Sequence, residues 1–453
     1  MMIEGVETET VELFSDKELR TMIIPLFLEQ LLVMCVGMAD TIVVSHVGEA
    51  AVSGVSLVNQ FNTIFIYLFT ALSSGGAIII SQYIGRKDRK QGGKSASQLL
   101  LFSTLFSIVI AGLVLLGNRS LMRLLFGKVE DSVMQACLTY LMISALSYPA
   151  LAVYNSGAAI YRSMGRTKAT MYISILSNVI NIIGNIIGVF VLHAGVAGVA
   201  YPSLIARIFS AVVITILCFQ KKNEVSYEAK WLFHWDGTLL KKILGVAIPN
   251  GIENGVFQLV KVALSSIVAL FGTYEIAANG VAQSIWSMAA LAAVSMGPVF
   301  ITVIGQCMGN RNVEAADYYF KKLMKLTLRM SCIWNLLILC LTPLFLRFYA
   351  LEPETKKLVI CLVFIHNIFN GIAFPFSGAL SNGLRAAGDV KYTMVISVVT
   401  TIFVRLLLSY VLGIACHMGV IGIAIAMVAD WLIRAAIFLR RQKTGEWKEF
   451  QVI

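Results

Sequence analysis

Charged residues are scarce in this sequence. Only 13% of the 453 residues are Asp, Glu, Lys or Arg, whereas 58% are hydrophobic and the mean hydropathy is +0.80. A soluble globular domain usually carries about 25% charged residues. The composition therefore excludes a soluble enzyme, a soluble nucleic-acid-binding protein and a disordered chain, and it predicts an integral membrane protein.

The sequence also lacks the patterns of a metal, redox or catalytic centre. Its eight cysteines form no C-x-x-C pair, and its five histidines form no H-x-x-x-H pattern. We therefore expect no disulfide framework, no zinc site and no resident cofactor. A polytopic membrane enzyme would need a convergent set of catalytic side chains within the apolar segments, so we do not expect an enzyme.

Long apolar runs are abundant instead. A membrane-spanning helix needs about 20 apolar residues, and no segment shows the alternating pattern that is typical of a barrel strand. The sequence predicts an all-α integral membrane fold with twelve spans. They are 22–44, 51–84, 95–117, 133–160, 169–193, 196–219, 243–270, 276–307, 323–346, 358–383, 391–415 and 418–439.

The basic residues lie mostly on one side of these spans. With twelve alternating spans, 25 of the 36 Lys and Arg fall on the side that holds both chain ends, and six fall on the opposite side. The positive-inside rule assigns the basic side to the cytoplasm, so both termini are expected there. The net charge of +11 then reflects loops that meet anionic lipid, and no nucleic-acid partner is expected.

The second half of the chain repeats the first. Pro25-x-x-x-Glu29 recurs as Pro249-x-x-x-Glu253, and five such pairs of motifs follow in the same order at spacings of 223–226 residues. Each unit holds six spans, an even number, so both units enter the membrane in the same direction as a parallel pseudo-two-fold repeat. The predicted organisation is a cytoplasmic N-terminal segment 1–20, an N-lobe 21–219, a cytoplasmic connector 220–241, a C-lobe 242–440 and a cytoplasmic tail 441–453.

Several motifs mark the ends and polar faces of the first six spans. They are Pro25 and Asp40, TIVVSHVGEAA at 41–51, SQYIG at 81–85, YRSMGRTK at 161–168, Asn178-x-x-Asn181 and GVAGVA at 195–200. In this order, and with twelve spans, the chain resembles the multidrug and toxic compound extrusion (MATE) family. The resemblance implies an antiporter whose two lobes alternate between inward-open and outward-open states. It implies export of organic cations, drugs or amphipathic metabolites, driven by inward Na⁺ or H⁺, from a bacterial plasma membrane. We expect a monomer in the lipid bilayer.

Four carboxylates lie within the predicted spans: Glu29, Asp40, Glu253 and Asp430. An ionisable group at bilayer depth is costly, so each is a candidate for function. Asp430 precedes Arg434 by four residues, which predicts a structural ion pair on one helix.

The resemblance assigns the coupling cation to Asp40, with Asn181, Asn185 and Ser203 around it. A carboxylate there can take a proton, or it can hold Na⁺ beside amide oxygens, so both ions remain open. The family often has an acidic residue where this chain has Asn185, which leaves Asp40 as the only carboxylate of the pocket. A structural hydrogen bond to a neighbouring helix is the other interpretation of Asp40.

Glu253 is a second coupling candidate, although family members with such a carboxylate tend to carry it about one turn further along, near Phe257. Lys261 follows on the same helix and is either a counter-charge, an occupant of a cation site, or a residue that packs between helices. Interhelical hydrogen bonding is the usual role of a single polar residue in a span. The candidates for the substrate cavity are Glu29, Gln60, Lys261, Gln283 and Asn370.

A flippase for lipid-linked oligosaccharides or other lipids, with a related architecture, is the alternative transporter hypothesis. Binding a pyrophosphate would require more basic residues in the cavity than this chain offers, namely Arg207, Lys261 and Arg405. We expect Arg207 and Arg405 to pair with carbonyls or lipid headgroups near the ends of spans.

Overall fold

The computed structural model describes residues 13–453 except 128, 350 and 451, so most of the predicted segment 1–20 lies outside the described residues. Every regular element of the described chain is a helix, and no β-strand occurs in it. The predicted all-α fold is therefore confirmed.

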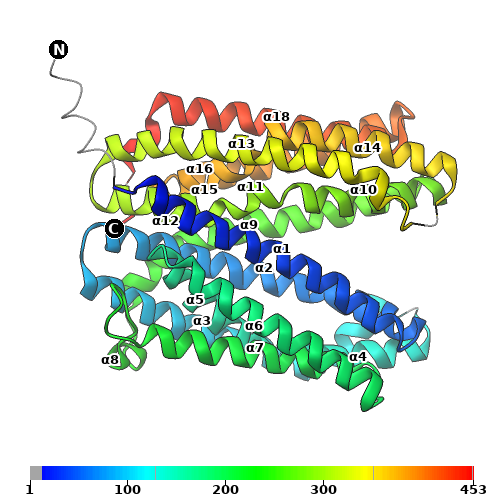
Figure 1. Ribbon diagram of the computed structural model, residues 1–453, viewed down its shortest axis with the longest axis horizontal. Coiled ribbons are helices and arrows are strands. Elements are labelled where there is room, and N and C mark those ends of the chain that lie inside the picture. The colour runs from blue at the N-terminus through cyan, green and yellow to red at the C-terminus, as the bar shows by residue number, and fades with distance from the viewer. Residues whose placement is uncertain (1–12, 128, 350, 451) are drawn as a thin grey trace. The chain divides into compact units, whose positions relative to one another are not determined.

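The helices form two compact units. The first unit is Arg20–Gly251, and the second unit is Ile252–Ile453 together with the described N-terminal residues up to Leu19. The first unit contains α1 (Asp16–Ser45), α2 (Glu49–Gly85), α3 (Arg89–Phe126), α4 (Asp131–Leu146), α5 (Tyr148–Ser163), α6 (Thr167–Ile186), η1 (Ile187–Val191), α7 (Ala197–Cys218), α8 (Ala229–Leu232) and the start of α9 (Gly237–Val268) (Figure 1).

The second unit contains the rest of α9 and the elements that follow it. They are α10 (Thr273–Ala289), α11 (Leu291–Ser295), α12 (Gly297–Gly309), α13 (Val313–Phe345), α14 (Pro353–Ile372), η2 (Pro375–Ala379), α15 (Leu380–Ala387), α16 (Val390–Val399), η3 (Thr400–Leu406), α17 (Leu407–Tyr410), η4 (Val411–Ala415), α18 (Gly419–Thr444) and η5 (Glu446–Glu449). The segments η1 to η4 are π-helical turns, and η5 is a 3₁₀ turn.

Each predicted span has a helical counterpart in the described chain. Ten helical runs there are long and apolar enough to cross a membrane, and α4 with α5, bent by 44°, makes an eleventh. The bend falls beside Pro149, which lies in the first turn of α5, where a proline is tolerated. The twelfth span is α9, a helix of 32 residues whose apolar sequence is interrupted by Glu253 and Lys261.

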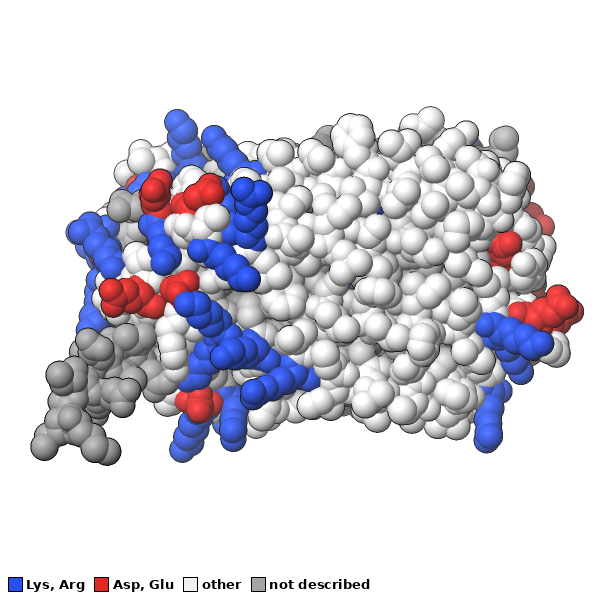
Figure 2. All heavy atoms as spheres, turned by 90° about the horizontal axis from the view of Figure 1, so that it is seen from above, with Lys and Arg blue, Asp and Glu red and all other residues white. Residues whose placement is uncertain are grey.

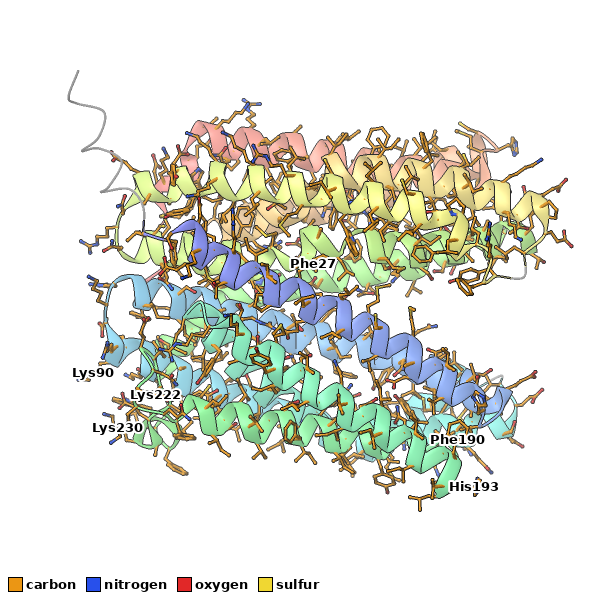
Figure 3. The ribbon with its side chains drawn as sticks, in the orientation of Figure 1. Phe27, Lys90, Phe190, His193, Lys222 and Lys230 are labelled. Carbon is orange, nitrogen blue, oxygen red and sulfur yellow. The ribbon has the colours of Figure 1, made fainter. Side chains whose placement is uncertain are left out.

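The surface of the helices is apolar along their middle. Charged side chains gather over the helix ends (Figure 2). In the first unit, Lys90, Lys222 and Lys230 lie at one end, and Phe190 and His193 lie at the other (Figure 3). Large apolar side chains of α3 face outward between these ends, and Leu116 is 90% exposed. Such a continuous apolar surface is suited to lipid contact.

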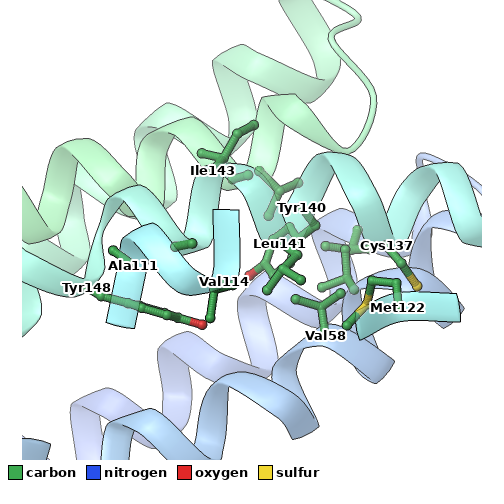
Figure 4. Packing of buried hydrophobic residues seen from close by; sticks show 14 of the residues in the cluster. Val58, Ala111, Val114, Met122, Cys137, Tyr140, Leu141, Ile143 and Tyr148 are labelled. Carbon is green, nitrogen blue, oxygen red and sulfur yellow. The ribbon is translucent and has the colours of Figure 1, made fainter. Parts of the chain in front are cut away.

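Close helix packing in the first unit depends on small residues. Val58, Cys137, Tyr140 and Leu141 belong to a buried cluster between α2 and α4 (Figure 4). At Gly54 on α2, an added Cβ would lie 2.6 Å from Ala136 Cβ, so only glycine permits this approach. Small residues at helix crossings are the usual means of close packing in membranes, where lipid competes for apolar contacts.

The predicted connector is fixed to α3. Gln98 Nε2 donates to the carbonyl oxygens of Trp231 at 2.7 Å and His234 at 2.6 Å, and Gln98 Oε1 accepts from the Asp236 backbone N–H at 3.0 Å. Asp236 also forms an ion pair with Lys94. These contacts hold the chain between α7 and α9 against the first unit.

Candidate functional site

The four polar residues predicted around the coupling cation meet in the first unit. Asn185 Nδ2 donates to Asp40 Oδ1 at 2.6 Å and to Asn181 Oδ1 at 3.0 Å. Asn181 Nδ2 in turn donates to Ser203 Oγ at 2.8 Å, and Ser203 Oγ donates to the carbonyl of Val199 at 3.2 Å. One hydrogen-bonded chain therefore links Asp40 on α1 to α6 and α7.

The helical spacing explains why these residues converge. Asn181 and Asn185 are four residues apart on α6, so they lie on one face, one turn from each other. Asn181 is 7% exposed and Asn185 is fully buried, which directs both amides into the bundle. Asp40 projects toward them from α1 and remains partly accessible.

An oxygen atom beside Asp40 has no hydrogen-bond partner among the described residues. Both bonds of Asn185 use its Nδ2, and its Oδ1 is buried without a donor. A carboxylate next to an unused amide oxygen is a set of hard oxygen ligands, the kind that hard cations such as Na⁺ prefer. The same carboxylate can take a proton, so the arrangement suits either ion.

Asp40 lies on the wall of a cavity of about 360 Å³ within the first unit. Ser203 and Asn181 also line it, as do further polar residues that the sequence analysis did not select. The lining residues that matter most here are Tyr154, Ser174, Ser177, Asn178, Arg207 and Ser210. The cavity is thus polar along α5, α6 and α7, with a carboxylate and a guanidinium on its walls.

Arg207 is placed differently from its prediction. We expected it to pair with carbonyls or headgroups near a span end, but its Nη1 donates to Ser147 Oγ at 2.6 Å and its side chain lines the cavity. The Ser147 hydroxyl donates to the Ser144 carbonyl at 2.6 Å, which leaves its oxygen free to accept from Arg207. The prediction failed because the sequence does not show that the bend at Ser147 brings an acceptor into the bundle.

Glu29 and Glu253 each form an ion pair with an arginine of their own unit. Arg162 Nη2 lies 2.7 Å from Glu29 Oε1, and Thr170 Oγ1 donates to Glu29 Oε2 at 3.2 Å. Arg385 Nη2 donates to both carboxylate oxygens of Glu253 at 2.7 Å. The two arginines recur in the sequence just as the glutamates do, a signal that the sequence analysis recorded without drawing the pairing from it.

Asp430 lies in a cluster of opposite charges in the second unit. Arg434 Nη2 lies 2.7 Å from Asp430 Oδ1, which confirms the predicted i,i+4 ion pair. Arg405 Nη2 lies 3.0 Å from Asp430 Oδ2, so the prediction that Arg405 pairs with carbonyls or headgroups is wrong. Asp430 is fully buried, and its two arginines offset the cost of burying its charge.

The remaining substrate candidates lie elsewhere. Gln60 on α2 and Lys261 on α9 are exposed, and Gln283 on α10 is half-buried. Asn370 on α14 is fully buried and its Nδ2 donates to Asn335 Oδ1 at 2.8 Å. None of these four residues, nor Glu29, lines the cavity beside Asp40. Their roles in substrate binding therefore remain predictions.

A family model described as MatE matches the chain twice, over residues 25–187 and 249–411. The chain belongs to the MatE family. The two matches begin 224 residues apart, which confirms both the resemblance and the internal repeat inferred from paired motifs. This is a family of multidrug efflux transporters.

Relatives cover nearly the whole chain. YisQ, an uncharacterized transporter of Bacillus subtilis (strain 168), is 26% identical over 431 residues, which span 93% of each chain. The probable multidrug resistance protein NorM of Thermotoga maritima is 26% identical over 450 residues, 96% of this chain and 94% of NorM. A solved structure of the outward-facing conformation of a multidrug resistance MATE family transporter of the MOP superfamily superposes with a TM-score of 0.89. It is 21% identical and covers 96% of this chain and 97% of that one, and the likeness shows the fold.

Proposed function

We propose that this chain is an antiporter that exports small organic solutes in exchange for inward Na⁺ or H⁺, with Asp40 as the coupling carboxylate. The observation that carries the proposal is the hydrogen-bonded chain from Asp40 through Asn185 and Asn181 to Ser203, on the wall of a cavity. A carboxylate at bilayer depth with only amide partners marks an ion pathway more often than a structural contact.

Coupling follows from what the ion does to this chain of hydrogen bonds. A proton on Asp40 removes the negative charge that Asn185 Nδ2 faces, and a Na⁺ competes with that N–H for the same oxygen. Either event changes the link between α1 and α6. An ion and a solute that favour different arrangements of these helices are thermodynamically coupled, since each alters the affinity for the other.

The same proposal includes the surroundings of the protein. The basic helix ends face the cytoplasm, as the positive-inside rule requires, so both termini are cytoplasmic. The chain works as a monomer in the plasma membrane of a bacterium, with lipid as its only macromolecular surroundings. The names of the relatives, a probable multidrug resistance protein among them, support a drug-like or amphipathic organic substrate.

The test is transport of a fluorescent organic solute in proteoliposomes, driven separately by a Na⁺ gradient and by a proton gradient. We expect one gradient to drive transport in the wild type. Asp40→Asn keeps the shape of the side chain and removes its charge. It should lower the driven rate by about tenfold or more, which corresponds to about 1.4 kcal/mol of lost coupling.

The matched control is Asp131→Asn, the same substitution at an exposed carboxylate in the first turn of α4. It should leave the rate unchanged. Normal driven transport in Asp40→Asn, with expression equal to the wild type, would contradict the assignment of Asp40. Absence of transport under both gradients in the wild type would contradict the antiporter itself.

A further inference from the structure

Arg207 differs from the other arginines that reach into the helix bundles. Four of these are each paired with a carboxylate: Arg162, Arg385, Arg405 and Arg434. Among the described residues, Arg207 has no carboxylate within ion-pair distance and donates to one hydroxyl, that of Ser147. A guanidinium has five N–H donors, so most of its capacity faces the cavity. The cavity wall thus carries a positive charge that the described chain does not neutralise.

The positive charge and the negative charge of the cavity lie at different depths. Ser177 Oγ donates to the Ala206 carbonyl at 3.0 Å, which places Arg207 level with residue 177 of α6. Asp40 is level with Asn185, its hydrogen-bond partner. These two levels are eight residues apart on α6, or about 12 Å along the helix axis. One solute of moderate size can therefore reach both charges.

A second donor stands beside Arg207. Asn178, on the cavity wall, has its Nδ2 buried with no hydrogen-bond acceptor among the described residues. Since it follows Ser177 in α6, it lies at the level of Arg207. A guanidinium with a neighbouring amide N–H is a set of donors that suits a carboxylate, which accepts several hydrogen bonds through its two oxygens.

We propose that the solute exported through this cavity is a zwitterion whose carboxylate binds Arg207 while its cationic group faces Asp40. This inference rests on the proposed antiport and specifies its substrate class. A simple organic cation would face Asp40 but be repelled by Arg207, and a simple anion would meet the reverse. A zwitterion matches both charges and adds no net charge to a site that must desolvate it.

The dimensions narrow the class further. A volume of about 360 Å³ is near the lower end of the roughly 300–1,000 Å³ that ligand pockets occupy. The separation of the two levels is too long for the adjacent charges of a free α-amino acid. The solute is therefore a small aromatic or amphipathic molecule whose ammonium and carboxylate stand at opposite ends.

Tetramethylrhodamine and its methyl ester form a matched pair of probes, because they share the cationic ring system and differ only in the carboxylate. Fluorescence polarisation with purified protein should show tighter binding of the zwitterion by about tenfold. Arg207→Gln should weaken zwitterion binding by about the same factor and leave ester binding unchanged or stronger. Arg207→Lys keeps the charge without the planar fork and should fall between them.

The control is Lys168→Gln, which removes a positive charge at the exposed first turn of α6, away from the cavity lining. It should bind both dyes as the wild type does. Equal binding of the two dyes by the wild type, no binding of the zwitterion, or an equal loss of both dyes in Arg207→Gln would each overturn the inference.

Transport separates this inference from the antiport on which it rests. Gradient-driven export of both dyes at equal rates, unaffected by Arg207→Gln, would leave the antiporter standing and overturn the zwitterion. Conversely, Arg207-dependent binding of the zwitterion without export under either gradient would support the site and overturn the antiport.

Discussion

The ion pair between Glu253 and Arg385 offers a direct test of how this fold tolerates charge within a membrane. Arg385 donates to both oxygens of Glu253 at 2.7 Å, and the two side chains are only 9% and 16% exposed. Removing one partner of such a pair leaves the other charge buried and uncompensated, which costs about 3–5 kcal/mol. Arg385→Met should therefore destabilise the second unit by roughly this amount.

The double variant gives the reasoning its sharp form. Replacing both partners by apolar residues of similar size is often close to neutral, because no charge then remains to be desolvated. Glu253→Met combined with Arg385→Met should thus lose less stability than either single variant, with an interaction energy of about 2 kcal/mol or more. The assay is the free energy of unfolding in a fixed mixed micelle, measured for the wild type, both single variants and the double variant.

Additive losses in the two single variants would refute this reasoning, because they would show that each side chain stabilises the fold independently. The same four proteins also test the coupling role predicted for Glu253. A folded double variant that keeps gradient-driven transport would assign Glu253 to structure. A folded double variant without transport would support Glu253 as a second coupling carboxylate.

Two further predictions concern the cytoplasmic connector and the helix packing. Lys94 and the Leu239 backbone N–H hold the pKa of Asp236 below its usual value, so its stabilising contribution is present above pH 4 or so and is lost as the pH falls through the lowered pKa. Asp236→Asn should therefore lower the melting temperature at pH 7 but not at pH 3. At Gly157 an added Cβ would lie 2.6 Å from Ile214 Cγ1, so Gly157→Ala should cost about 1–3 kcal/mol in the unfolding free energy.

The architecture was accessible from the sequence because the membrane restricts the possible folds. In lipid every backbone polar group must be bonded within its own segment, so each long apolar run had to be a helix. The motif pair Pro25/Pro249 then divided the helices into two equivalent halves. Positions of residues in a helix follow from their spacing, which is why Asn181 and Asn185 could be placed on one face with Asp40.

The partners of charged residues were less accessible, because they lie on helices distant in the sequence. Arg162 is 133 residues from Glu29, and nothing local indicates their contact. Arg434 was paired correctly since Asp430 is on the same helical face. Arg207 was misplaced because its environment depends on the bend at Ser147 and on a cavity that no local pattern describes.

The internal repeat explains why the two units differ at this place. Arg162 and Arg385 are 223 residues apart, whereas Gly195 and Gly419 are 224 apart, so the second unit has one extra residue between these points. The π-helical turn η4 corresponds to η1 at a spacing of 224, but η3 has no counterpart in the first unit. A π-helical turn accommodates an inserted residue without ending the helix. The extra residue is therefore absorbed at η3, which carries Arg405.

This insertion coincides with an exchange of chemistry between the units. Counting 224 residues back from Asp430 and Arg434 gives Ala206 and Ser210, and both of these line the cavity of the first unit. The second unit thus fills the equivalent position with ion-paired side chains, where the first unit keeps small residues and open volume. A neutral, fully paired cluster cannot take up a cation without first breaking an ion pair, while Asp40 has only an amide to release. The repeat therefore favours one coupling carboxylate, in the first unit, over a symmetric pair.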